Sequence, residues 1–244
     1  MAGSDKMNKK IGVLDSGIGG TTVLDKIVEL LPKEEYVYYA DTKNNPYGEK
    51  SDAELYRIVK DVVTFLIRKK NCKIIVLACN TATTKCMKKL QKEFPDMLFV
   101  GTVPAVKVAC DNHYKHTLVL ATPATIDSER MAELVKDNKK DDQEMILYPC
   151  PGLADAIEKE RKDKIIQILK KIKQEMQDKK IDSIVLGCTH YPLIKDQIKE
   201  YFPNVMLLDG SFGVAQEVKR QLESHNLLSQ TSTGNIEYID SEGI

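Results

Sequence analysis

Several features that would place a chain of this size in a special class are missing from this sequence. The chain has 244 residues but no run of about eighteen apolar residues, so we expect no membrane-spanning segment and no membrane partner. The polar start, MAGSDKMNKK, lacks the apolar stretch of a secretory signal, which favours a cytoplasmic protein. Lysine plus arginine equals aspartate plus glutamate, 36 of each, so no net charge favours binding to nucleic acid.

Metal-binding and nucleotide-binding patterns are missing as well. The six cysteines include no CxxC pair, so we expect no zinc site and no other metal site. The sequence has neither a G-x-G-x-x-G turn nor the lysine of a P-loop, so nucleotide binding is only weakly indicated. A chain without a secretory signal keeps its thiols reduced. Four thiols are best explained as small core residues: Cys72, Cys86, Cys110 and Cys150.

An internal repeat organises the chain. The segment 71–94, NCKIIVLACNTATTKCMKKLQKEF, resembles the segment 181–202, IDSIVLGCTHYPLIKDQIKEYF, with Cys79 aligned on Cys188. Each copy predicts a buried strand, then a cysteine, a turn that contains threonine, and a helix. In parallel sheets, the groups just past the carboxyl end of a strand line the ligand crevice. The repeat therefore predicts two thiols in equivalent positions of two similar units.

Strand-like and helix-like stretches alternate along the whole chain, which predicts an α/β fold with parallel sheets. We expect two similar α/β domains related by a pseudo-twofold axis, residues 7–101 with 207–244 and residues 102–206, with the ligand between them. Residues 1–6 are interpreted as a cloning remnant. Besides the repeats, the predicted strands are 11–15, 36–40, 97–101, 117–121, 145–148, 205–208 and an edge strand at 235–239, and one predicted helix runs from the turn 122–125 to about residue 136.

Two thiols that face one ligand from opposite sides can invert a carbon centre. A helix N-terminus lowers a thiol pKa from about 8.5 toward neutrality, so one cysteine can remove a proton from a carbon acid. The other thiol then protonates the opposite face. Asp15 and His190 are the groups that can tune the two thiols. The turns after the cysteines supply groups that stabilise charge on a substrate carboxylate: Asn80, Thr81, Thr189 and His190.

The same residues are also compatible with different or less specific roles. A nucleophilic Cys-His enzyme needs one cysteine, and His190 is only two residues from Cys188, which is a poor cue for such a dyad. The cysteine pair can also be two core residues inherited by duplication. The turn 15–20, DSGIGG, either only shapes the backbone or binds an anion at a helix N-terminus. Tyr47, in a turn-like loop, either covers a ligand or packs on the base of its own loop.

Four motifs resemble those of the glutamate racemases, which belong to the cofactor-independent aspartate/glutamate racemase superfamily. The motifs are DSGIGG at 15–20, PYG at 46–48, ACNTA at 78–82 and GCTHYP at 187–192, in the family's order and at its intervals. This resemblance spans nearly the whole chain. It implies two α/β domains with the active site between them, and a homodimer. It also implies interconversion of L- and D-glutamate without a cofactor, which supplies D-glutamate for peptidoglycan.

The resemblance also assigns roles by motif match. Cys79 and Cys188 become the two bases, and Asp15 and His190 assist them. Glu158 stands where the family often has a glutamate near the site, although a place on a helix surface fits equally well. The implied substrate-binding residues are Asp15, Ser16, Tyr47, Gly48, Asn80, Thr81, Thr122, Thr125, Thr189 and His190.

Two stretches depart from the family pattern, GTVPA at 101–105 and CPGLA at 150–154, and these affect the pocket wall and dimer contacts. Two other functions compete with glutamate racemisation. One is a racemase of the same superfamily that acts on another amino acid, such as aspartate. The other is a non-catalytic module that binds a small anion through the turn 15–20.

Overall fold

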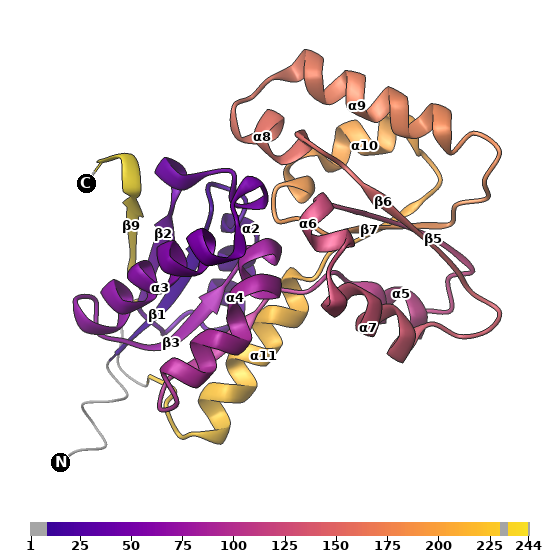
Figure 1. Cartoon of the computed structure of the whole chain (residues 1–244). Helices are drawn as coiled ribbons and strands as arrows, with labels where there is room; N and C mark the ends of the chain where they lie inside the picture. The colour runs from indigo at the N-terminus through magenta and orange to yellow at the C-terminus, as the bar shows by residue number, and fades with distance from the viewer. Residues whose placement is uncertain (1–8, 230–233, 244) are drawn as a thin grey trace. The chain divides into compact units, whose positions relative to one another are not determined.

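The structure of the protein, a computed structural model, describes residues 9–229 and 234–243. These residues form two compact units: unit 1 comprises 9–102, 211–229 and 234–243, and unit 2 comprises 103–210. Each unit is built on its own parallel β-sheet, which confirms the predicted fold class of two parallel-sheet α/β sets (Figure 1). Residues 1–6, interpreted as a cloning remnant, lie outside the described residues.

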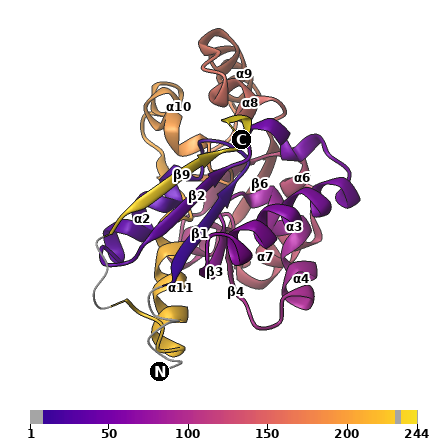
Figure 2. The same ribbon diagram turned by 90° about the vertical axis from the view of Figure 1, so that its left-hand side faces the viewer.

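The sheet of unit 1 has the strand order β4-β3-β1-β2-β9, and all its strand pairs are parallel. Figure 2 shows β9 lying along β2 at one edge of this sheet. Its strands are β1 (Lys10–Asp15), β2 (Tyr36–Ala40), β3 (Cys72–Leu77), β4 (Leu98–Gly101) and β9 (Ile236–Asp240). Its helices are α2 (Thr21–Leu30), α3 (Asp52–Arg68), α4 (Asn80–Glu93) and α11 (Ser211–Ser224), with 3-10 turns η1 (Thr42–Asn44), η2 (Tyr47–Glu49) and η4 (Ser241–Gly243).

Helices cover both faces of the sheet in unit 1. Successive strand residues point to opposite faces. On β1, Ile11 and Val13 pack with α2 and α11, whereas Leu14 packs with α3 and α4. Every residue of β3 is buried, as expected for a strand that faces core on both sides. This burial fixes the register of the strands and therefore the residues that emerge at their carboxyl ends.

Unit 2 repeats this arrangement. Its strand order, β6-β5-β7-β8, follows the same pattern as β2-β1-β3-β4 in unit 1, so the internal repeat extends to the topology. Its strands are β5 (His116–Ala121), β6 (Glu144–Pro149), β7 (Ser183–Leu186) and β8 (Met206–Leu208), and its 3-10 turn is η3 (Tyr191–Ile194). Its helices are α5 (Val106–Asp111), α6 (Pro123–Ile126), α7 (Glu129–Asn138), α8 (Leu153–Glu158), α9 (Lys162–Glu175) and α10 (Lys195–Tyr201).

Several element boundaries differ from the sequence predictions. Residues 207 and 208 belong to β8, which pairs with β7, so the chain returns to unit 1 at Ser211. The predicted helix from the turn 122–125 to residue 136 is two helices, because Ser128 accepts a hydrogen bond from Met131 N at 3.1 Å and caps a new helix there. No bounds were predicted for the short helices α5 and α8. Among the described residues, no helix combines the length and the apolar character that crossing a membrane requires.

A buried ion pair closes the amino-terminal end of the sheet in unit 1. Lys73 Nζ lies 2.7 Å from Glu34 Oε2, and both side chains are almost fully buried. Lys73 also donates to the carbonyl of Leu227 at 2.7 Å, and Glu34 accepts from the amide of Ser229 at the same distance. Burial lowers the pKa of Lys73, and the Glu34 contact opposes that shift. The pair thus fastens the segment after α11 to the sheet.

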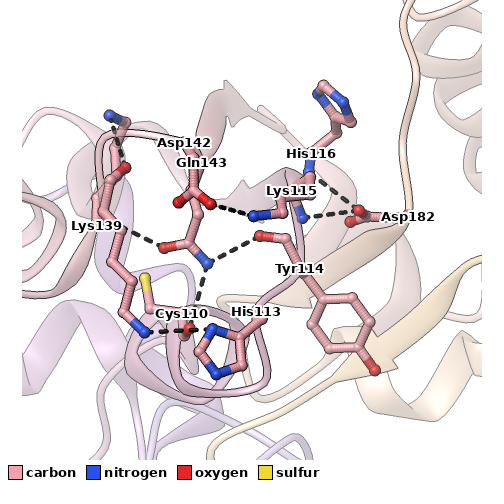
Figure 3. Close-up of polar contacts among 10 residues, drawn as sticks. Cys110, His113, Tyr114, Lys115, His116, Lys139, Asp142, Gln143 and Asp182 are labelled. Carbon is pink, nitrogen blue, oxygen red and sulfur yellow. Dashed lines mark hydrogen bonds and ion pairs between the residues drawn. The ribbon is translucent and has the colours of Figure 1, made fainter.

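A polar network has the same place in unit 2, at the amino-terminal ends of β5, β6 and β7 (Figure 3). The Asp182 carboxylate accepts from the amides of Lys115 and His116 at 2.8 and 3.2 Å. The buried Gln143 side chain donates to the carbonyls of Cys110 and Tyr114 at 3.2 and 2.9 Å. Both units therefore tie their amino-terminal strand ends with structural contacts, and the opposite ends carry the motif residues.

The two copies of the repeat differ by one methyl group just before each cysteine. Ala78 is fully buried in the first copy, and Gly187 takes its place in the second. A Cβ atom on Gly187 would lie 2.8 Å from the carbonyl oxygen of Leu120 and 2.9 Å from the Cβ of Ala121. Glycine is therefore required at position 187 by the close approach of β5.

We predict that Gly187→Ala lowers the free energy of unfolding by about 1–3 kcal/mol, because the new methyl overpacks the contact with β5. Gly213→Ala is the matched control, since a Cβ there would meet no atom within 4 Å and the position is helical. The control is expected to leave stability unchanged or raise it by up to about 1 kcal/mol. Thermal and urea unfolding followed by circular dichroism compare the two, and equal effects would contradict the steric argument.

Candidate active site

Cys79 lies at the junction of β3 and α4, where the sequence places it. It is the N-cap residue of α4, and its carbonyl accepts a hydrogen bond from Thr83 N at 2.9 Å. The residue is only 7% exposed. The first amides of a helix have no partner inside the helix and favour negative charge. A thiolate at Cys79 would therefore lie next to a stabilising dipole.

Asp15 ends β1, the strand beside β3. Its side chain therefore emerges at the carboxyl-terminal end of the sheet, as does Cys79. The carboxylate is fully buried and accepts from the amide of Gly17 at 3.1 Å. A Cβ on Gly20 would lie 2.5 Å from the Cβ of Asp15, so the glycine turn wraps tightly around the acid. Ser16, in the same turn, is buried as well.

Tyr47 packs into the same cluster from the loop after β2. Its side chain is 2% exposed, and its hydroxyl donates to Asp41 Oδ2 at 2.7 Å. Burial raises the pKa of Tyr47 well above its usual value, and negative charge on Asp41, Cys79 and Asp15 raises it further. The hydroxyl therefore stays protonated and its neighbours are acidic groups. Asp41 was not singled out from the sequence, although an acid directly after a strand that neighbours β1 was a usable signal.

Asn80 presents a buried hydrogen-bond acceptor at the start of α4. Its Oδ1 atom is buried and has no hydrogen-bond partner in the structure. Leaving such an acceptor unpaired costs about 1–3 kcal/mol, so water or a substrate group is expected to donate to it. Thr81, the next residue of α4, is buried too, and Gly48 borders open space, since a Cβ there would meet no atom within 4 Å. These residues make up the Cys79 cluster: Asp15, Ser16, Asp41, Tyr47, Gly48, Cys79, Asn80 and Thr81.

Cys188 follows β7 in unit 2, but its surroundings differ from those of Cys79. The predicted turn between cysteine and helix is present in this copy, because Thr189 and a 3-10 turn, η3, come between Cys188 and α10. In the first copy the prediction is wrong, since α4 begins at Asn80, directly after Cys79. Pro192 lies within η3, where its missing N–H costs no α-helical hydrogen bond. The Cys188 carbonyl accepts from Tyr191 N at 3.1 Å, so the chain turns sharply after the thiol. The residue is 7% exposed, like Cys79.

His190 connects Cys188 to a carboxylate. The Cys188 Sγ atom lies 3.8 Å from His190 Nδ1, and His190 Nε2 lies 2.5 Å from Glu158 Oε2. The His190 and Glu158 side chains are 3% and 11% exposed. A carboxylate on one ring nitrogen fixes the ring orientation and stabilises its protonated form. The sequence left Glu158 undecided between the site and a helix surface, and the structure places it against His190.

The predicted threonines of unit 2 lie past the carboxyl-terminal ends of its strands, as Cys188 does. Thr122 follows β5, which neighbours β7, and its Oγ1 lies 3.0 Å from the Oγ1 of Thr125 and accepts from Thr125 N at 3.3 Å. Thr125 and Thr189 are both buried. Thr122 therefore caps α6, a structural role that the motif match did not foresee. These residues make up the Cys188 cluster: Thr122, Thr125, Glu158, Cys188, Thr189 and His190.

The four other cysteines are packing residues in geometry. All of them are almost completely buried and none forms a disulfide. Burial raises the pKa of Cys72, Cys86 and Cys150 to about 12, and it also raises the pKa of Cys110. No group of histidine, cysteine and acidic side chains within residues 9–229 and 234–243 could hold a metal ion.

We predict that at most two thiols of the native protein react with a thiol-specific disulfide reagent at about pH 8, whereas all six react in denaturant. A thiol reacts only if it ionises and the reagent can reach its sulfur. The four packing cysteines are buried and have raised pKa values, so they meet neither condition. Absorbance of the released chromophore gives the number of reactive thiols, and mass spectrometry identifies them. Modification of Cys72, Cys86, Cys110 or Cys150 in the folded protein would contradict this assignment.

Comparison with known proteins agrees with this arrangement. The sequence model of the family described as Asp/Glu/Hydantoin racemase matches residues 11–216. The glutamate racemase of Clostridium perfringens is 40% identical over 243 residues, which cover 97% of this chain and 92% of that protein. Glutamate racemase from Francisella tularensis, solved in complex with D-glutamate, has a TM-score of 0.83 at 29% identity, covering 96% and 89% of the two chains.

A further structure, Escherichia coli glutamate racemase in complex with L-glutamate and the activator UDP-MurNAc-ala, has a TM-score of 0.79 at 30% identity. The match covers 88% of this chain and 83% of that one. The fold, the placement of the motif residues at strand ends and these similarities lead to one assignment. This chain belongs to the Asp/Glu/Hydantoin racemase family.

Proposed function

We propose that this protein is a glutamate racemase that interconverts L- and D-glutamate with Cys79 and Cys188 as its two bases. The observation that carries the proposal is the equivalent position of the two thiols. Each follows the matching strand of a repeated sheet, β3 or β7, and each has an ionisable partner beside it. The names of the relatives support glutamate as the substrate.

The proposed reaction breaks and remakes one C–H bond. One cysteine, as the thiolate, takes the α-proton, and the electron pair of the broken bond moves toward the substrate carboxylate. The second cysteine, as the thiol, gives its proton to the opposite face of the α-carbon and becomes the thiolate. The product has inverted configuration, and the enzyme is left in the reverse protonation state. The proposed reaction requires that both thiols reach the same α-carbon.

The neighbours of the thiols suit the two proton transfers. Asp15 lies with Cys79 at the carboxyl-terminal end of the sheet in unit 1. His190 contacts Cys188 through one ring nitrogen and Glu158 through the other. We assign Asp15 and His190 to assist these transfers and Glu158 to orient His190. The unpaired Oδ1 of Asn80 is a suitable acceptor for a substrate N–H group. The remaining substrate-binding assignments are Ser16, Tyr47, Gly48, Thr81, Thr122, Thr125 and Thr189.

Further parts of the proposal concern the biological setting. Two thiols supply both proton transfers, so the reaction needs no cofactor. Six free thiols suit a reducing compartment, which favours the cytoplasm. The resemblance to glutamate racemases supports a homodimer and the supply of D-glutamate for peptidoglycan. Sedimentation of the purified protein tests the dimer.

Proton NMR of L-glutamate with the protein in D2O, with circular dichroism on the same sample, tests the activity. Loss of the α-proton signal together with decay of the optical signal to zero is the expected result. Exchange of aspartate rather than glutamate would move the protein to another substrate within the family. Tight binding of glutamate with neither change would leave only an anion-binding module.

We predict that Cys79→Ser and Cys188→Ser each lower racemisation by at least about 100-fold, because each removes one acid–base group. Each variant is also expected to retain exchange of the α-proton from one enantiomer, with opposite preference in the two variants. Deuterium exchange of D- and L-glutamate measured separately checks this. Cys110→Ser, at a buried cysteine outside both clusters, controls for the loss of a thiol. Full racemisation by either site variant would overturn the two-thiol mechanism.

We predict that Glu158→Gln lowers kcat by roughly 10- to 100-fold, since a charge-assisted hydrogen bond to His190 is lost. The exchange reaction that depends on Cys188 is expected to slow more than the one that depends on Cys79. Glu160→Gln changes an exposed glutamate two residues away and serves as the control. Equal slowing of both exchange reactions would contradict a role for Glu158 through His190.

A further inference from the structure

Asp41 organises the loop between β2 and α3, which carries Tyr47. Its carboxylate is buried and accepts from Asn44 Nδ2 at 2.9 and 3.1 Å as well as from the Tyr47 hydroxyl at 2.7 Å. Between Asp41 and Tyr47 the chain forms η1, and its residues are half-buried or exposed. This part of the loop therefore depends on hydrogen bonds more than on apolar burial.

The last described segment of the chain supplies hydrogen bonds to this loop. Strand β9 pairs with β2, in parallel and at the edge of the sheet, and η4 follows it (Figure 2). The Asp240 carboxylate accepts from the hydroxyl of Thr42 and, at 2.9 Å, from the amide of Glu242. The buried Ser241 hydroxyl oxygen accepts from the amide of Lys43 at 3.0 Å. Both acceptors thus hold η1, which adjoins Asp41.

A second contact from β9 reaches the other loop of the Cys79 cluster. The ring of Tyr238 lies 5.9 Å from that of Tyr38, its register partner on β2. The Tyr38 hydroxyl donates to the carbonyl of Gly17 at 2.6 Å, within the turn that wraps Asp15. The segment of β9 and η4 therefore contacts η1 directly and, through Tyr38, the turn that wraps Asp15.

We propose that the segment Ile236–Gly243 is a positioning element for the Cys79 cluster, acting through Asp240 and Ser241. These two residues hold η1, η1 holds Asp41, and Asp41 sets the Tyr47 hydroxyl beside Cys79 and Asp15. The inference rests on the proposed racemase function and extends it to residues that touch no reacting atom. A substrate-binding loop that is less well held binds its ligand more weakly, because the loop must then be ordered on binding.

The test uses the full chain with Ser241→Ala and Asp240→Ala, and Asp240→Asn as the conservative variant. Loss of one hydrogen bond to η1 is expected to raise KM for glutamate about five- to tenfold, with a smaller change in kcat. Asp240→Asn keeps an oxygen that accepts from Thr42, so it is expected to restore most of the affinity. Unchanged KM in both alanine variants would overturn the proposal.

Glu237→Gln is the matched control on the same strand. Glu237 pairs with Lys10 and Lys70 at the opposite end of β9 from η4. This variant loosens β9 without touching the loop, so KM is expected to stay within about twofold of the parent value, the range of a weak surface pair. An equal rise of KM in Glu237→Gln and Ser241→Ala would show a general effect of β9 on stability and would overturn the specific role of Ser241.

A double-mutant cycle with Tyr47→Phe identifies the route of the effect. If Ser241 acts through Asp41 and Tyr47, the double variant Ser241→Ala/Tyr47→Phe has the same kcat/KM as Tyr47→Phe alone. Independent, multiplying losses would overturn that route.

Limited trypsin digestion gives a readout that does not depend on activity. Ser241→Ala is expected to speed cleavage after Lys43 and Lys50 severalfold, while other cleavage sites keep their rates. An inactive parent protein would refute the proposed racemase function. Unchanged cleavage after Lys43 and Lys50, in an active or an inactive protein, would refute the positioning element.

Discussion

Pairing of parallel strands is the constraint on which the rest of this structure depends. Because the strands of each sheet run in one direction, the residues just past their carboxyl ends lie together at one end of the sheet. Burial on both faces fixes the strand register, so Asp15 and Cys79 emerge together in unit 1, and Thr122 and Cys188 do so in unit 2. The amino-terminal ends carry structural polar contacts instead.

The two clusters lie at matching positions of one repeat but differ in chemistry. Cys79 lies at the start of an α-helix, with a buried carboxylate and a tyrosine as neighbours. Cys188 lies before a 3-10 turn, next to an imidazole that is held by a carboxylate. In the proposed reaction each thiol serves alternately as acid and as base, and the substrate is chiral, so the two sides need not be alike.

Much of this arrangement could be predicted from sequence, because alternating apolar runs and turn residues are local signals. The strands and the position of Cys79 at a helix start follow from them. The repeat predicts a turn after Cys188 but not its 3-10 form, since Pro192 changes the local hydrogen bonding. Glu158 and His190 are 32 positions apart in sequence, and their contact depends on how α8 packs against η3. Asp240 and Ser241 reach η1 across an even longer separation, 198 positions, so no local pattern could indicate them.

The glycine at position 187 has a consequence for how two similar segments coexist in one chain. An alanine in that place, as at position 78 of the other copy, would collide with the backbone oxygen of Leu120. The collision occurs at the residue that immediately precedes a thiol, so transfer of sequence from the first copy to the second would carry a structural penalty. The two copies are therefore not interchangeable at this position, because the alanine of the first fits the second only if β5 shifts.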